Sequence, residues 1–146
     1  MQQRHMVVGL LALLFSSWVW AASPVGEWTT IDDKTHKPRG VMKLTLRNGQ
    51  LSGRLVNVYV QKGDINKCVK CKGRFKNVPI LGMTNMWGLK QTRDPAVWDG
   101  GHILDPKSGK EYRCKLTVSK DGKTLDVRGY VGFSLFGRTQ TWHRRA

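Results

Sequence analysis

Residues 125–144 read LDVRGYVGFSLFGRTQTWHR and carry the clearest structural signal in the chain. In the first half of this stretch, polar side chains separate the apolar or small residues Leu125, Val127, Gly129 and Val131. A period of two residues is typical of a β-strand with one buried face. Glycines interrupt the pattern at 132 and 137, and a second short run, 139–144, follows them. The sequence therefore predicts two strands that complete the core at the end of the chain.

Similar runs recur along the chain and predict six further strands, at 25–31, 41–47, 51–60, 79–86, 98–104 and 110–118. Short turn sequences join most of them; the strongest is Asn48-Gly49, because both positions tolerate a positive φ. Consecutive hairpins form an antiparallel meander, and eight strands are enough to close such a meander into a barrel. We therefore expect an all-β fold, an antiparallel meander that closes into an eight-stranded β-barrel. A two-sheet sandwich is the alternative that the pattern leaves open.

The N-terminal segment 1–21 has the organisation of a secretory signal peptide. Arg4 precedes an apolar run from 6 to 19, and small residues end the segment at a cleavage site. We expect cleavage after Ala21, a single domain at 22–146, no transmembrane segment after cleavage, and a location in a bacterial periplasm.

The chain is strongly basic, with a formal net charge of +15. Residues 22–146 hold 24 Lys and Arg against 10 Asp and Glu, which gives +14 after removal of the signal peptide. Such a charge attracts polyanions. In an exported protein the available anions are those of the envelope surface, namely phospholipid head groups, lipopolysaccharide phosphates and acidic glycans, and we expect no nucleic acid as partner. The basic residues are spread along the strands, so a solvated basic surface without a dedicated anion site is the alternative.

Several segments together resemble the DUF2147 family of exported bacterial proteins. They are Gly26–Asp33, Trp98–Pro106, Gly129–Gly132 and Gly137–Trp142, and the segment Cys68–Gly73 is similar to one found in many members. The resemblance extends over nearly all of 22–146. It implies a lipocalin-like β-barrel and little about activity, since the function of the family is unknown and it offers no catalytic residues to carry over.

Gly26-x-Trp28 also resembles the opening of lipocalins, in which a tryptophan plugs the closed end of the barrel and a late arginine stacks over its ring. Arg144 is the best positional match for that arginine. The resemblance therefore implies that Trp28 and Arg144 form a structural plug and that the first and last strands are neighbours.

Cys68 and Cys71 form a Cys-x-x-Cys pair in a lysine-rich loop. In an oxidising compartment such a pair is a disulfide, a redox centre or half of a metal site. No helix-forming run follows the pair to lower a thiol pKa, so we favour a structural disulfide, with a redox or metal protein as the alternative. Cys114 alternates with apolar residues of its strand and is expected to be a buried thiol.

The sequence gives no support for catalysis. None of the four histidines stands in a spacing typical of a hydrolase, and only ten acidic residues are present. We therefore expect no enzyme, no cofactor and no metal. The residues expected at the interior or mouth of the barrel, where a small apolar or amphipathic ligand would bind, are Tyr112, Leu116, Val131, Phe133 and Phe136. The alternative function is a basic envelope protein with a filled barrel that engages anionic lipid head groups or a protein partner.

Overall fold

Eight antiparallel strands follow one another around the molecule in chain order. The computed structural model describes residues 21–133 and 136–146. Its strands are β1 (Gly26–Ile31), β2 (Pro38–Arg47), β3 (Gln50–Val58), β4 (Thr84–Gln91), β5 (Val97–Asp105), β6 (Lys110–Val118), β7 (Thr124–Tyr130) and β8 (Gly137–Arg144), with one 3-10 turn, η1 (Gly73–Phe75). Each strand pairs with the next, which is the meander that the alternating pattern predicts.

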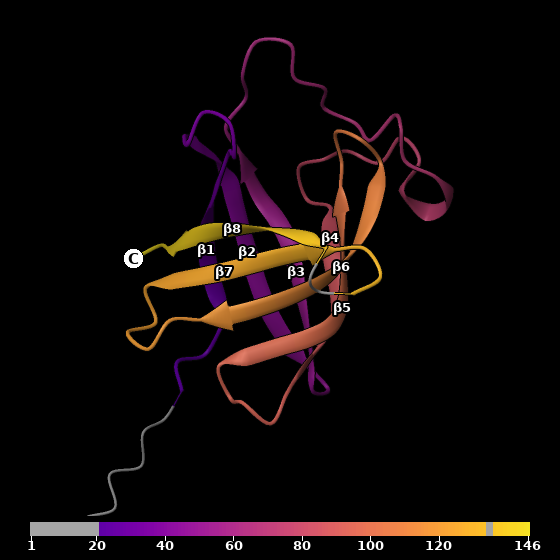
Figure 1. Cartoon of the computed structure of the whole chain (residues 1–146). Helices are drawn as coiled ribbons and strands as arrows, with labels where there is room; N and C mark the ends of the chain where they lie inside the picture. Colours follow the sequence, from indigo (N-terminus) through magenta and orange to yellow (C-terminus); the bar gives the residue numbers. More distant parts are fainter. Residues whose placement is uncertain (1–20, 134–135) are drawn as a thin grey trace, which may run out of the picture.

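The sheet closes on itself because β1 pairs with β8 (Figure 1). Trp28 lies opposite Arg144, and Thr29 lies opposite His143. The expected eight-stranded barrel is confirmed, and the sandwich alternative is wrong. The pairing between β1 and β8 consists of these two residue pairs, so the seam that closes the barrel is short.

The alternation of side chains determines which face of each strand is buried. In β6, Cys114, Leu116 and Val118 are 0–4% exposed and face inward, as the sequence predicts. The β2–β3 hairpin turns at Asn48-Gly49, whose φ angles of 50° and 73° lie in the left-handed region that this turn requires.

The fourth strand begins later than the sequence predicts. The expected run, 79–86, is wrong for its first half, because 79–83 form a turn in which the Met83 N–H donates to the Ile80 carbonyl (3.1 Å). Pro79 makes only an isolated bridge to Lys67. Both apolar residues are buried as part of the β3–β4 connection: Ile80 packs against the barrel core, and Met83 packs with Cys68, Cys71 and Leu104.

The connections alternate between the two ends of the barrel. We call one end the open end; its connections are 32–37, 59–83, 106–109 and 131–136. At the opposite, closed end lie 48–49, 92–96, 119–123 and both termini of the domain. The 59–83 connection is the longest and extends beyond the barrel at the top of Figure 1.

The predicted signal peptide, 1–21, lies almost wholly outside the described residues. Within 21–133 and 136–146, no helix is long and apolar enough to cross a membrane.

Candidate functional site

A cavity of about 700 Å³ opens among the four connections of the open end. Its walls come from strands on all sides of the barrel, and its mouth is bordered by Ile31, Ile65, Pro106 and Phe136. It therefore occupies the upper half of the barrel, with access from one end. A volume of this size lies within the range of roughly 300–1,000 Å³ that is typical of small-molecule sites.

The deep part of the cavity is mainly apolar. Its lining side chains include Met42, Leu55, Ile103, Val127 and Trp142, of which all but Ile103 are at most 9% exposed. These residues belong to the inward-facing positions of β2, β3, β5, β7 and β8. An apolar chain or ring placed here would lose water contact on every side.

The barrel below this cavity is filled. Leu44, Leu51, Leu89, Leu116 and Leu125 are fully buried and pack in one cluster with Trp28. The cluster separates the cavity from the closed end, so a ligand can enter only through the mouth.

Trp28 and Arg144 close the opposite end, and the predicted contact between them is present. The guanidinium carbon of Arg144 lies 4.2 Å from the centre of the Trp28 ring, and Trp28 is fully buried. Arg144 also donates to the carbonyls of Ser23, Val25 and Gly122, while the Trp28 indole donates to the Pro24 carbonyl (2.8 Å). The plug therefore ties the N-terminal segment to the end of β8.

A few polar groups lie along the cavity wall. Asn85 is 5% exposed, and its amide nitrogen donates to the Leu104 carbonyl (3.0 Å). That bond fixes the orientation of the amide, and the other end, Oδ1, has no hydrogen-bond partner among the described residues. A buried acceptor without a partner is costly, so a ligand with a hydroxyl or amide donor would gain from reaching it.

Ion pairs surround the mouth. Arg39 donates two hydrogen bonds to the Asp64 carboxylate (2.9 and 3.1 Å) and lies 4.0 Å from Asp32. Arg138 pairs with Asp33 at 2.9 Å. Both arginines come from strands and all three carboxylates from connections, so these pairs hold the connections over the edge of the barrel.

The charges that line the cavity cancel. Four acidic residues, Asp32, Asp33, Asp64 and Asp105, face four basic ones, Lys34, Arg39, Lys107 and Arg138. The net charge of residues 22–146 therefore resides on the rest of the surface. The cavity is close to neutral inside a strongly basic protein.

The same contacts shift the pKa values of the rim groups. The hydrogen bonds from Arg39, followed by the backbone N–H of Gln61, lower the pKa of Asp64 below its ordinary value. Backbone N–H groups of Thr35 and Lys34 lower the pKa of Asp32. Both carboxylates are therefore charged at neutral pH, which keeps the ion pairs intact.

The residues predicted at the interior or mouth divide into two groups. Tyr112, Val131 and Phe136 line the cavity. Leu116 lies deeper, fully buried in the filled part of the barrel, and Phe133 is 78% exposed outside the cavity lining. Val131, expected inside its strand, is 64% exposed because β7 ends one residue earlier. Part of the Phe133–Phe136 segment, 134–135, lies outside the described residues.

Cys68 and Cys71 form the predicted disulfide. Both are at most 1% exposed and pack with Met83 and Leu104 in a small cluster outside the barrel wall. The bond therefore holds the long β3–β4 connection against β5, as expected of a structural disulfide. Cys114 is a buried free thiol, and burial raises its pKa to about 12.

No metal site is evident in the described part of the chain. Within 21–133 and 136–146, no three His, Cys, Asp or Glu side chains come together in an arrangement that could hold an ion.

The sequence did not identify the rim ion pairs or Asn85. The sequence did contain a signal for the ion pairs, because acidic residues are scarce in this chain. Four of them lie at or beyond strand ends on the same side of the meander: Asp32, Asp33, Asp64 and Asp105. Asn85 gave no signal, because its burial and its bond to the Leu104 carbonyl depend on residues distant in the sequence.

Comparison with known proteins agrees with this architecture. The barrel is similar to protein HP1028 from the human pathogen Helicobacter pylori, which belongs to the lipocalin family. The two structures superpose with a TM-score of 0.74 at 17% sequence identity, over 86% of this chain and 85% of that chain. At this identity the similarity is one of fold. A search of the curated proteins found no match. The family model described as "Uncharacterized protein conserved in bacteria (DUF2147)" matches residues 26–144, and the chain therefore belongs to the DUF2147 family.

Proposed function

We propose that this protein binds a small amphipathic molecule in the open half of its barrel and carries out no catalysis. The observation that supports this proposal most directly is the cavity of about 700 Å³, which has an apolar floor and a polar, charged rim. Lipocalin-like folds suit such a role, because the closed barrel is a rigid container whose lining can vary.

The lining indicates the chemical class of the ligand. Its apolar part would lie against Met42, Val127 and Trp142. A hydroxyl or amide donor would reach the unpartnered Oδ1 of Asn85. The charges of the lining balance, and Arg39 and Arg138 are already paired with carboxylates, so a molecule without net charge enters at the lowest electrostatic cost.

The proposed location is the periplasm, after cleavage of residues 1–21. The apolar segment and its cleavage site in the sequence support this location. In that compartment the Cys68–Cys71 disulfide would be stable, since the environment is oxidising.

Native mass spectrometry of protein purified from its own periplasm tests the proposal directly. We expect a population heavier than the polypeptide by the mass of a bound organic molecule, which is lost on denaturation. Binding of N-phenyl-1-naphthylamine, an uncharged apolar fluorophore, should in addition quench Trp142 by energy transfer.

Gly129 offers a way to fill the cavity without disturbing the backbone. It lines the cavity, and a Cβ there would lie no closer than 3.6 Å to its neighbours. Gly129→Leu should therefore fold and weaken fluorophore binding by at least about tenfold, whereas Gly129→Ala should bind nearly as the wild type does. Unchanged binding in the folded leucine variant would show that the ligand does not use the barrel interior.

A further inference from the structure

Exposed apolar side chains are concentrated at one end of the barrel. Of eleven large apolar residues exposed in the described part of the chain, eight lie in the open-end connections: Tyr59, Val60, Ile65, Val69, Leu81, Val131, Phe133 and Phe136. Leu46 and Val56 lie on strands, and only Val25 belongs to the closed-end segments. Such clustering marks an interaction surface, whereas single exposed apolar residues are ordinary.

The open end also carries most of the basic residues found outside the strands, because its connections are longer. The open-end connections contain nine Lys or Arg and three Asp, whereas the closed-end segments contain four Lys or Arg and two Asp. The difference comes mainly from the 59–83 connection, which has six basic residues and one Asp.

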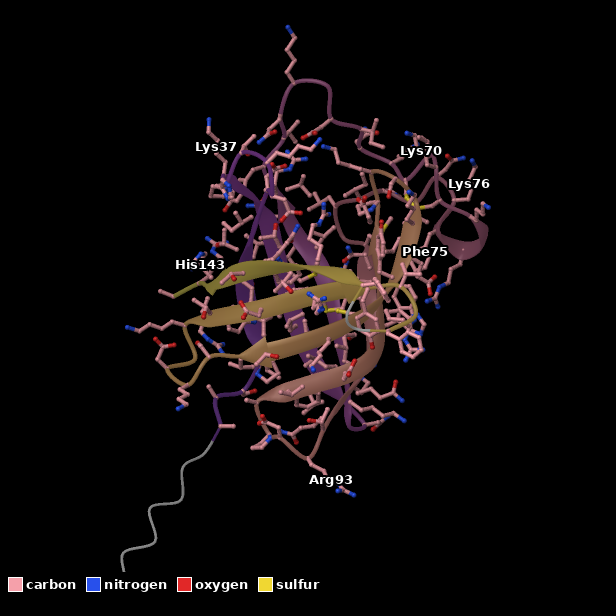
Figure 2. The ribbon with its side chains drawn as sticks, viewed as in Figure 1. Lys37, Lys70, Phe75, Lys76, Arg93 and His143 are labelled. Atoms are coloured by element: carbon pink, nitrogen blue, oxygen red, sulfur yellow. A yellow bond between two sulfur atoms is a disulfide. The ribbon has the colours of Figure 1, made fainter. Side chains whose placement is uncertain are left out.

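The basic side chains of this connection are available to a partner. The three Asp residues of the open end are bonded to Arg39 and Arg138, which belong to strands. Lys62, Lys67, Lys70 and Lys72 are exposed and form no ion pair with any described carboxylate. In Figure 2, Lys37, Lys70 and Lys76 project from the upper part of the molecule, while Arg93 projects from the opposite end.

We propose that the open end docks on an anionic phospholipid surface. Exposed aromatic residues and exposed lysines, carried by different connections of the same end, match the chemistry of such a surface, since rings can enter the headgroup region and ammonium groups can lie over phosphates. The most exposed aromatic side chains, Phe133 and Phe136 (78% and 67%), belong to the connection that borders the mouth. The cavity mouth then faces the lipid. This docking does not depend on the proposed ligand binding, although together they would let a ligand pass between membrane and barrel without crossing water.

Co-sedimentation of residues 22–146 with phosphatidylglycerol–phosphatidylcholine vesicles tests the docking. We expect binding to these vesicles and little binding to pure phosphatidylcholine. The affinity should fall as salt is raised, because the Debye length shortens from about 30 Å at 0.01 M to about 8 Å at 0.15 M.

Two matched quadruple variants separate docking from general attraction. The open-end variant replaces four exposed lysines by Gln: Lys62, Lys67, Lys70 and Lys72. The control variant also replaces four exposed lysines by Gln, but these lie on strands or at the closed end: Lys43, Lys90, Lys120 and Lys123. Both lose the same charge. The first should bind at least about tenfold more weakly, and the second should keep most of the affinity. Equal losses would overturn the proposal.

The aromatic side chains provide an independent test. Phe133→Ser with Phe136→Ser should weaken vesicle binding most clearly at high salt, where charge contributes least. Leu46→Ser with Val56→Ser removes two partly exposed apolar residues from strands and should leave binding unchanged. Wild-type affinity in the phenylalanine variant would overturn the proposal. Gly129→Leu should bind vesicles normally, so a failure of docking is distinguishable from a failure of ligand binding.

Discussion

Arg144 and Trp28 show how two residues at opposite ends of the domain close the barrel. The guanidinium covers one face of the indole at 4.2 Å, and its N–H groups satisfy carbonyls of the N-terminal segment. Stacking of a cation on an aromatic ring stabilises by about 0.5–2 kcal/mol, depending on how far water is excluded. Because the ring is fully buried, most of its contribution is apolar packing.

We expect Trp28→Ala to lower the free energy of unfolding by about 3–5 kcal/mol, since it empties a buried aromatic site. Arg144→Ala should cost less, through lost stacking, hydrogen bonds and coverage by its aliphatic stem. The double variant should show a coupling energy of about 0.5–3 kcal/mol. Urea unfolding of the two single variants and the double variant measures all three values. Strict additivity would show that the contact contributes nothing in solution.

Cys114 should be the only cysteine that reacts with a thiol reagent before reduction, and its reaction in the native protein should be slow. Its buried thiol has a pKa of about 12, so almost no thiolate is present at pH 8. Reaction with a thiol reagent should be slow in the native protein and rapid in denaturant, with one thiol per chain before reduction and three after. Three accessible thiols in freshly isolated protein would contradict the disulfide between Cys68 and Cys71.

The long β3–β4 connection is held at several points along its length. Arg39 of β2 binds Asp64, and the disulfide packs against Leu104 of β5. These contacts fix a long segment whose own sequence favours no regular structure. The connection can therefore border the cavity in a defined position.

The Arg39–Asp64 pair should make stability depend on pH. The pKa of Asp64 is lower in the folded protein than its ordinary value, so this contribution is complete above the unfolded pKa of about 3.9 and is lost as pH falls through the lower folded pKa. The stability difference between wild type and Asp64→Asn should therefore shrink as pH is lowered from about 5. Thermal unfolding of both proteins across this range measures it; a constant difference would contradict the ion pair.

Two inward glycines on strands should respond differently to the same small change. A Cβ at Gly101 of β5 would lie 2.5 Å from the Leu89 side chain and 2.6 Å from the Trp87 carbonyl, whereas one at Gly129 has ordinary contacts. Gly101→Ala should therefore destabilise by about 1–3 kcal/mol through overpacking, and Gly129→Ala should be nearly neutral. Denaturant unfolding measures both; equal effects would contradict the close approach of β4 and β5.

At the scale of the whole molecule, charge is separated between the surface and the cavity. The cavity lining is balanced, and the surplus of basic residues lies on the rest of the surface. Self-repulsion of a large net charge opposes the compact state.

Moderate salt should therefore raise the melting temperature, because screening weakens this repulsion more than it weakens the few ion pairs of the rim. The variant that replaces Lys43, Lys90, Lys120 and Lys123 by Gln carries four fewer charges and should show a smaller rise. Calorimetry between about 0.02 and 0.2 M salt, over which the Debye length shortens roughly threefold, tests this; a fall in melting temperature for the wild type would contradict it.

The sequence by itself determined the hairpins, the strand faces and the closing plug. Asn48-Gly49 and the alternation in β6 are local properties, since they depend on residues next to each other in the chain. The contact between Trp28 and Arg144 was also predicted. The resemblance to lipocalins implied their roles, and the first and last strands of a closed meander must be neighbours. Cys68 and Cys71 are three residues apart, so their disulfide could also be predicted from residues close together in the chain.

Only the tertiary structure decided what the barrel contains. Apolar alternation predicts that Tyr112 and Leu116 both face inward, yet Tyr112 lines the cavity and Leu116 lies in the filled half. The first half of the expected 79–86 strand was wrong for the same reason, since Ile80 and Met83 are buried as parts of the β3–β4 connection and not of a strand. The Arg39–Asp64 pair joins residues 25 positions apart. Local pattern gives the direction of a side chain, but empty volume and ion pairing depend on which distant side chains share the same space.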